Sequence, residues 1–137
     1  MPATIRPVGY FYATVKDRPG EAYRLLARLA REEVNLLAFN AVPQGPAHTQ
    51  LVIFPQEESA LARVAESLGL VLTGPQNAFL IQGDDELGAL VEVHEKLSDA
   101  NINVYASNGV TDGNSAYGYV IYLRPQDFDE AVQVLGL

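Results

Sequence analysis

The chain has 137 residues, 48% of them hydrophobic, and it contains no cysteine. This composition excludes disulfides, thiolate chemistry and cysteine-ligated metals, and without an apolar run of membrane-spanning length or a secretory leader it favours a small cytoplasmic protein with no membrane partner. The formal net charge of -8 opposes binding to a phosphate backbone, so no nucleic-acid partner is expected.

The charge is distributed unevenly along the chain. Residues 1–74 carry seven basic and seven acidic side chains, whereas residues 75–137 carry two basic and ten acidic ones. The second half therefore supplies the whole negative balance.

In the first half of the chain, apolar residues first alternate as in a strand and then recur at the spacing of a helix. Residues 8–15 alternate, with Phe11 on one face and Tyr10 on the other, which predicts a strand. Apolar residues at helical spacing then predict a helix that opens at Gly20, with Arg24, Arg28 and Arg31 on its solvent face. The further predicted elements are strands over 34–42 and 49–54, a helix over 57–68 and a short strand over 70–73. This βαββαβ order is that of ferredoxin-like folds.

The second half repeats the first. The segment from Gly20 to Asn35 has the same length as that from Gly88 to Asn103. The predicted elements of this half are a strand over 78–82, a helix over 86–100, strands over 102–110 and 116–123, and a helix over 126–135. No residues remain for a fourth strand, so the sheet edge stays open unless residues 3–6, the 70–73 strand or a second chain covers it.

The predicted fold class is therefore α+β, with two ferredoxin-like βαββαβ repeats over residues 1–74 and 75–137. Each repeat is expected to have an antiparallel sheet with helices on one face, and the second repeat lacks its last strand. A unit of this length buries only about 60% of the surface of its unfolded chain and is marginally stable alone, so pairing of repeats and of chains into a homodimer is expected.

The sequence around the first helix resembles the ACT domain, in the stretch "VKDRPGEAYRLLARLAREEVNLLAF". The second half matches the same pattern with "GDDELGALVEVHEKLSDANINVY", in which Leu87 replaces the proline. The resemblance implies a βαββαβ regulatory module of the kind found in amino-acid-metabolism enzymes and as free-standing tandem proteins. Such modules bind amino acids or similar metabolites at the interface of two side-by-side copies, through the loop before the first helix and the start of the second strand.

Physical reasoning points to the same place. Gly20 and Gly88 are expected in the first turn of their helices, where backbone amides have no intrahelical partner and a ligand carboxylate could approach without meeting a Cβ. An Asp in each loop could meet an ammonium group, and an Asn at each following strand offers a donor and an acceptor. The predicted ligand-binding residues are Asp17, Arg18, Pro19, Gly20, Asn35, Asp85, Gly88 and Asn103.

Other interpretations of these residues remain open. Asp17 and Asp85 could be ordinary helix caps, and the two asparagines could merely end turns. His94 lies on an apolar stripe, where a histidine satisfied by a neighbour is favoured over a metal ligand. No catalytic residue, metal site or cofactor is predicted.

The resulting functional hypothesis is a non-enzymatic regulatory module that senses an amino acid at the interface between ACT-like repeats and informs a partner enzyme or transporter. The alternatives are an RNA-recognition-like or protein-interaction module, favoured by tyrosines on the strands, and a small ferredoxin-like enzyme. The RNA-recognition alternative lacks the basic consensus. The basic stripe of the first helix could also dock on the acidic second half of a partner chain.

Overall fold

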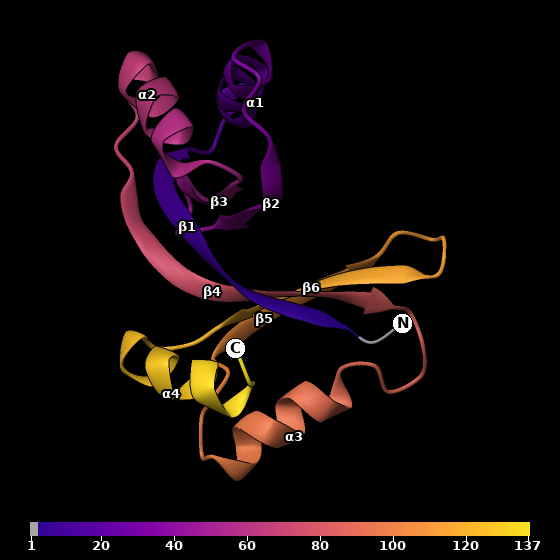
Figure 1. The fold of residues 1–137 in the computed structure, drawn as a ribbon. Coiled ribbons are helices and arrows are strands. Elements are labelled where there is room, and N and C mark those ends of the chain that lie inside the picture. Colours follow the sequence, from indigo (N-terminus) through magenta and orange to yellow (C-terminus); the bar gives the residue numbers. More distant parts are fainter. Residues whose placement is uncertain (1–2) are drawn as a thin grey trace. The chain divides into compact units, whose positions relative to one another are not determined.

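The computed structural model describes residues 3–137, which form an α+β chain with an antiparallel six-stranded sheet and four α-helices (Figure 1). A short 3-10 helix, η1, precedes the last helix. The elements are β1 (Thr4–Lys16), α1 (Glu21–Arg31), β2 (Leu36–Pro43), β3 (His48–Pro55), α2 (Glu58–Leu68), β4 (Thr73–Asp84), α3 (Val91–Asp99), β5 (Ala106–Thr111), β6 (Ala116–Tyr122), η1 (Pro125–Asp127) and α4 (Phe128–Val134). Among these residues no helix is both long and apolar enough to cross a bilayer.

The chain divides into two compact units. The inner unit is Gly9–Gln76, and the outer unit combines Met1–Val8, of which residues 3–8 are described, with Asn77–Leu137. The strand order β2-β3-β1-β4-β6-β5 gives the inner unit the order β2-β3-β1-β4 and the outer unit the order β1-β4-β6-β5. Both orders are those of a four-stranded ferredoxin-like sheet, in which the first and last strands are neighbours.

The first residues of β1 occupy the strand position that the outer unit's own sequence leaves open. They lie beside β4, where the Thr4 hydroxyl donates a hydrogen bond to the carbonyl oxygen of Gln82 at 3.4 Å. Ile5 packs against the apolar core of the outer unit. Of the three ways to cover this edge, the structure therefore uses the N-terminal segment.

The strand predicted over 78–82 is part of β4, which runs from Thr73 to Asp84, whereas of the strand predicted over 70–73 only Thr73 lies in a strand. The polar stretch around Gly74 and Pro75 interrupts the apolar alternation, and the sequence pattern therefore predicts a gap between two strands there. The backbone nevertheless stays extended next to β1. Gly74 has a φ of 137°, and a Cβ there would lie 2.8 Å from the carbonyl oxygen of Tyr10, so this close approach requires glycine.

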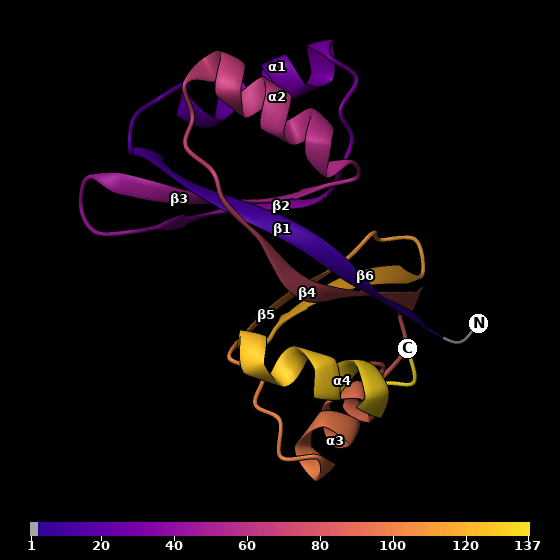
Figure 2. The ribbon, with the colours of Figure 1, turned by 60° about the vertical axis from the view of Figure 1, so that its left-hand side comes forward.

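In the inner unit, α1 and α2 lie side by side on one face of the sheet (Figures 1 and 2). Strands β1 and β3 pair antiparallel, with Phe11 opposite Ile53. The residues buried between helices and sheet are Phe11, Leu25, Leu29, Leu51, Ile53, Leu61 and Val64. On the opposite face, Tyr10 packs on Phe54 with ring centroids 5.1 Å apart. The predicted alternation of this strand is thus confirmed.

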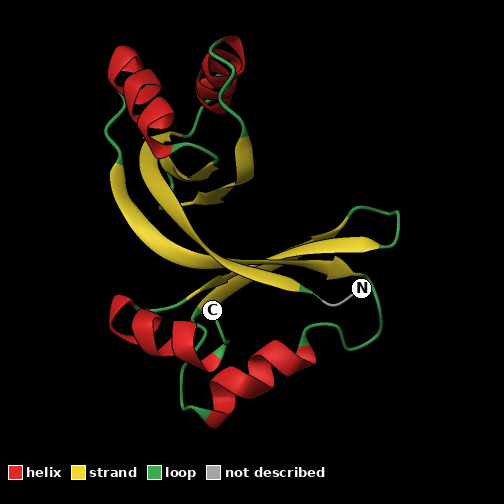
Figure 3. Ribbon diagram, in the orientation of Figure 1, coloured by secondary structure: helices red, strands yellow, loops and turns green. Residues whose placement is uncertain are grey.

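In the outer unit, α3 and α4 cover one face of the strands (Figure 3). Strand β6 pairs antiparallel with β4 and with β5, placing Tyr119 opposite Ile81 and Gly109. The buried core comprises Phe79, Ile81, Val93, Leu97, Ile102, Tyr119, Ile121, Leu123, Ala131 and Leu135. Strand β5 begins at Ala106, later than the predicted residue 102, because the amides of Asn101 and Ile102 still bond back to Ser98 O and Leu97 O at the end of α3.

Backbone hydrogen bonds at the helix ends and hairpins of the two units recur 68 residues apart. In both units a residue of positive φ lies two positions beyond the end of the helix that follows the first strand: Glu33 after α1 and Asn101 after α3, each with φ 59°. The matching bonds are Val34 N to Leu29 O and Ile102 N to Leu97 O, Asp17 N to Ala47 O and Asp85 N to Ser115 O, and Gln44 N to His48 O and Asp112 N to Ala116 O. The sequence repeat therefore coincides with a repeat in backbone geometry.

Candidate functional site

The loop between β1 and α1 leaves the start of the helix open. Gly20, directly before α1, has a φ of 92°, and a Cβ on it would meet no atom within 4 Å. The left-handed backbone, and not crowding, therefore explains the glycine. No side-chain hydrogen bond caps this end of α1, so the first-turn amides keep donors for an acceptor from outside the helix.

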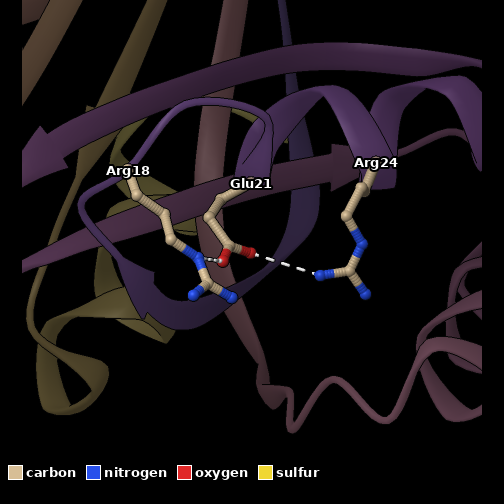
Figure 4. A network of polar contacts seen from close by, with 3 residues as sticks. All are labelled: Arg18, Glu21 and Arg24. Atoms are coloured by element: carbon tan, nitrogen blue, oxygen red, sulfur yellow. Dashed lines mark hydrogen bonds and ion pairs between the residues drawn. The ribbon is translucent and has the colours of Figure 1, made fainter.

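Glu21, the first residue of α1, holds two arginines at this opening (Figure 4). Its carboxylate accepts a hydrogen bond from Nε of Arg18 and a second, at 3.4 Å, from Nη1 of Arg24. The Glu21 side chain is only 12% exposed, whereas those of Arg18 and Arg24 are 58% and 57% exposed. This Glu21 network therefore combines a shielded negative group with two accessible positive groups.

A pocket of about 230 Å³ lies beside the Glu21 network. Its charged wall is the network together with Lys16. Its apolar wall is formed by leucines from α1, β3 and the end of α2, namely Leu25, Leu51, Leu68 and Leu70. The pocket thus offers both signs of charge next to an apolar surface.

Only one of the predicted ligand-binding residues of the inner unit, Arg18, lines this pocket. Asp17 is exposed, and its backbone amide closes the loop onto Ala47 at 2.9 Å. Asn35 lies ahead of β2, beyond the other end of α1. Since α1 has 11 residues at a rise of 1.5 Å each, about 16 Å of helix separates Asn35 from Gly20 within one unit. The structure therefore does not bring Asn35 to the loop within one chain.

Sequence reasoning missed Lys16, Glu21 and Arg24 as site residues. Arg24 was expected on the solvent face, and Glu21 received no role. A signal was present for Arg24, because Glu21 and Arg24 are three residues apart on α1, and residues three apart on a helix are neighbours.

The prediction that Gly88 lies in the first turn of the second helix is wrong. Helix α3 begins at Val91, and Gly88 lies in a turn in which the Ala89 amide bonds to Glu86 O and the Val91 amide to Gly88 O. Leu87, which replaces the proline of the first repeat, is fully exposed. Without a proline to fix the entry, the chain makes an extra turn before the helix.

A larger pocket of about 780 Å³ lies between this turn and the β5–β6 hairpin. Two of the predicted residues, Asp85 and Gly88, line it, and Glu86 adds a second carboxylate. Its apolar lining includes Leu87, Leu90, Val91, Val110, Tyr117 and Tyr119. Burial, and after it the charge of Glu86, raises the pKa of Tyr117 above its ordinary value. The pocket is therefore apolar with an acidic rim, unlike the basic pocket of the inner unit.

Asn103 lies apart from Asp85 and Gly88. It lines a separate hollow of about 400 Å³ with His94 and Asn101, near the C-terminal end of α3. His94 is half-buried, and its Nε2 lies 2.7 Å from the Tyr119 hydroxyl. The prediction that a neighbour satisfies this histidine is confirmed. Across residues 3–137 no three His, Asp or Glu side chains gather as a metal-binding group.

Comparison with known proteins finds similarity at the level of structure. No family model and no curated protein sequence matches the chain. Protein BT0572 from Bacteroides thetaiotaomicron superposes with a TM-score of 0.79 at 18% identity, covering 97% of this chain and 88% of that one. The regulatory subunits of aspartate kinase from Thermus thermophilus (ligand-free) and Thermus flavus give TM-scores of 0.69 and 0.61 at 11% and 12% identity, each covering 98% of this chain and 95% of the other.

At these identities the likeness concerns the fold. It agrees with the strand order and with the helices on one face of each unit's strands. The chain therefore has an ACT-like, ferredoxin-like α+β fold.

Proposed function

We propose that the protein is a cytoplasmic, non-enzymatic regulatory module of two ACT-like repeats that senses a small amino acid. The inner unit is the first repeat, and the outer unit, completed by the N-terminal strand, is the second. Two of the similar structures are regulatory subunits of an enzyme of amino-acid metabolism, aspartate kinase, which supports a regulatory role. The repeated backbone hydrogen bonds support the tandem arrangement.

The observation that carries this proposal is the meeting of both charge signs and an apolar wall in the inner pocket. Arg18, Arg24 and Lys16 would hold a ligand carboxylate, and the Glu21 carboxylate would accept from its ammonium group. The leucine wall would receive a short apolar side chain. At about 230 Å³ the pocket is below the roughly 300–1,000 Å³ typical of sites for drug-sized ligands, so a small amino acid fits best.

The Glu21 network does not block such a ligand. Each guanidinium has five N–H donors, and the bonds to Glu21 involve one nitrogen of each arginine. Both arginine side chains are more than half exposed, so a ligand carboxylate can reach their remaining N–H donors without displacing Glu21. The shielded Glu21 carboxylate meanwhile stays fixed as an acceptor for the ammonium group.

The asparagines predicted from the family resemblance would reach the ligand from a second copy of the chain. Since α1 separates Asn35 from Gly20, both can contact one ligand only if they come from different units. In a homodimer, Asn35 or Asn103 of one copy would meet the loop of the other. Binding would then shift the population of dimer arrangements and inform a partner enzyme or transporter.

A thermal-shift screen against the common amino acids tests the proposal. A selective ligand should stabilise the protein by about 2.7 kcal/mol at a concentration of 100 times its Kd. Glu21→Gln should strongly reduce this shift, because the neutral amide oxygen can still accept a hydrogen bond from an ammonium group but lacks the negative charge that pairs with it. Glu32→Gln is the matched control, since Glu32 also pairs with an arginine of α1 but does not line the pocket.

The proposal fails if no amino acid stabilises the protein, or if Glu21→Gln keeps the full shift. Stabilisation by RNA alone would favour the RNA-recognition alternative, and hydrolysis of ester or phosphate substrates would favour an enzyme.

A further inference from the structure

In the Glu21 network, one carboxylate lies between two guanidinium groups (Figure 4). Arg18 bonds to Oε1 of Glu21 through its Nε, and Arg24 bonds to Oε2 through its Nη1. The two arginines therefore lie on opposite sides of the carboxylate. Along the network, the charges follow the order positive, negative, positive.

Each of the three groups keeps the capacity for a further bond. A carboxylate has about four lone-pair sites, and each Glu21 oxygen accepts from one arginine. Both terminal nitrogens of Arg18, and Nε and Nη2 of Arg24, take no part in the bonds to Glu21. Such a pair of guanidinium nitrogens binds a carboxylate through two parallel hydrogen bonds. The network can therefore accept one cation and two carboxylates together.

The pocket beside the network has an excess of positive charge. Its lining contains three basic side chains and one carboxylate, that of Glu21, so its formal charge is +2. Asp17, which is next to Lys16 and Arg18 in the sequence, does not line the pocket. A neutral zwitterion would leave this excess unchanged, whereas a ligand with a net negative charge reduces it.

We propose that the ligand of this pocket is a dicarboxylic amino acid of the size of aspartate or glutamate. Its ammonium group lies between two carboxylates, so its charges follow the order negative, positive, negative and complement the network. The ammonium group bonds to Glu21, each carboxylate bonds to one arginine, and the side-chain methylenes pack on the leucine wall. This inference rests on the proposed function and narrows the class of amino acid.

Ligands with other charges fit the network less well. A neutral amino acid has one carboxylate and gives a partner to only one of the two arginines. The side-chain cation of a basic amino acid would face a guanidinium, and like charges in contact oppose binding. A dicarboxylate without an ammonium group brings no cation to Glu21. Among amino acids, the expected order of affinity is therefore acidic, neutral and then basic.

Calorimetric titration of the intact chain with matched ligands tests this charge arrangement. Asparagine and glutamine have nearly the size of aspartate and glutamate but lack the second negative charge. Succinate and glutarate keep both carboxylates but lack the ammonium group. One of the two acidic amino acids should bind about tenfold more tightly than its amide and than its diacid. This factor is modest for charge-assisted hydrogen bonds, because both arginines are more than half exposed.

Two arginine variants test which groups give the preference for the acid. Arg18→Gln and Arg24→Gln each leave one guanidinium, so the acid and its amide can then pair one carboxylate each, and the preference should fall to about twofold or less. Arg28→Gln is the matched control, because Arg28 lies on the same helix and pairs with Glu32 at 3.1 Å but does not line the pocket. This control should keep the full preference. Circular dichroism verifies that each variant is folded.

Removal of the central charge should reverse a second preference. In Glu21→Gln the network has two positive groups with no negative group between them. Succinate should then bind more tightly than aspartate, or glutarate more tightly than glutamate. A merely structural role of Glu21 would lower the affinity for both ligands without reversing their order.

An amide that binds as tightly as its acid would overturn this inference and leave the amino-acid sensor of the proposed function in place. A preference for the acid that survives both arginine variants, or an unchanged order in Glu21→Gln, would also overturn it. A diacid that binds the wild type as tightly as the amino acid would overturn it together with the role of Glu21 in the proposed function. If no amino acid binds, both proposals fail.

Discussion

The Tyr119 hydroxyl lies 2.7 Å from Nε2 of His94 and joins β6 to α3 inside the outer unit. Tyr119 is buried and His94 is half-buried, and their rings are 5.8 Å apart. Because Tyr119 is only 6% exposed, its hydroxyl depends mainly on His94 for a hydrogen bond.

Replacing the tyrosine should therefore destabilise the protein. Tyr119→Phe leaves the His94 nitrogen without this partner, and we expect a loss of about 1–2 kcal/mol in the free energy of unfolding. Urea unfolding measures the loss. Tyr105→Phe is the control, since Tyr105 is half-exposed and its hydroxyl deletion should change stability by less than about 0.5 kcal/mol. Equal effects of both substitutions would contradict the structural role of the His94 bond.

The raised pKa of Tyr117 should make the stability of the fold depend on pH in the alkaline range. Burial first, and the Glu86 charge second, raises its pKa above 10.0, so folding favours the neutral phenol. The contribution of the Tyr117 phenol to the free energy of unfolding is fully present below about pH 10. It is lost as the pH rises through the pKa of the folded state. When tyrosinate absorbance is followed against pH, the wild type should show a component that titrates above about pH 10, and Tyr117→Phe should lack it. Glu86→Gln should move that component to lower pH, and an unchanged curve would contradict the charge effect.

The N-terminal strand should stabilise the outer unit. Ile5 packs on the apolar core of that unit, so Ile5→Ala should cost about 1–3 kcal/mol, less than for a fully buried site. Hydrogen exchange should show faster exchange in residues 77–84 of β4, beside the strand. Arg6→Ala changes an exposed neighbour and should leave exchange as in the wild type. Unaltered protection in Ile5→Ala would mean that the strand contributes nothing there.

Two glycines with equally open surroundings should respond differently to alanine. A Cβ would meet nothing within 4 Å at Gly20 or Gly118, but Gly20 has a φ of 92°. Gly20→Ala should cost about 1–2 kcal/mol through backbone strain. Gly118→Ala, in β6, should be neutral or slightly stabilising because alanine loses less chain entropy on folding. Chemical denaturation of both variants measures the difference, and equal costs would show that φ is not the cause.

Much of the fold was predictable because local periods and the repeat agreed. Phe11 and Tyr10 face opposite sides of β1, as their alternation predicts. Other features of the fold depend on pairing between residues far apart in the sequence, and a local sequence pattern cannot predict such pairing. The pairing of β1 with β4 in the outer unit joins Thr4 to Gln82, 78 residues apart. The continuity of β4 through Gly74 likewise depends on the backbone of β1 beside it.

The site was less predictable than the fold. The predicted loop borders the inner pocket through Arg18, but sequence spacing did not show that Asn35 lies at the far end of α1. Glu21 and Arg24 were missed because helical periodicity separates buried from exposed faces and does not rank exposed polar groups. In the second repeat, exchanging proline for Leu87 delays the helix start, a change that the shared motif conceals.

The inner unit is inserted in the chain between the two segments of the outer unit. Once it folds, its ends lie together, since a Cβ on Gly9 would be 3.8 Å from the Gln76 carbonyl oxygen. A folded insert therefore spares the surrounding unit most of the entropy of closing a long loop. We therefore expect the connectivity to set the order of folding. A substitution that unfolds the inner unit should also unfold the outer unit, whereas one that unfolds the outer unit should leave the inner unit folded.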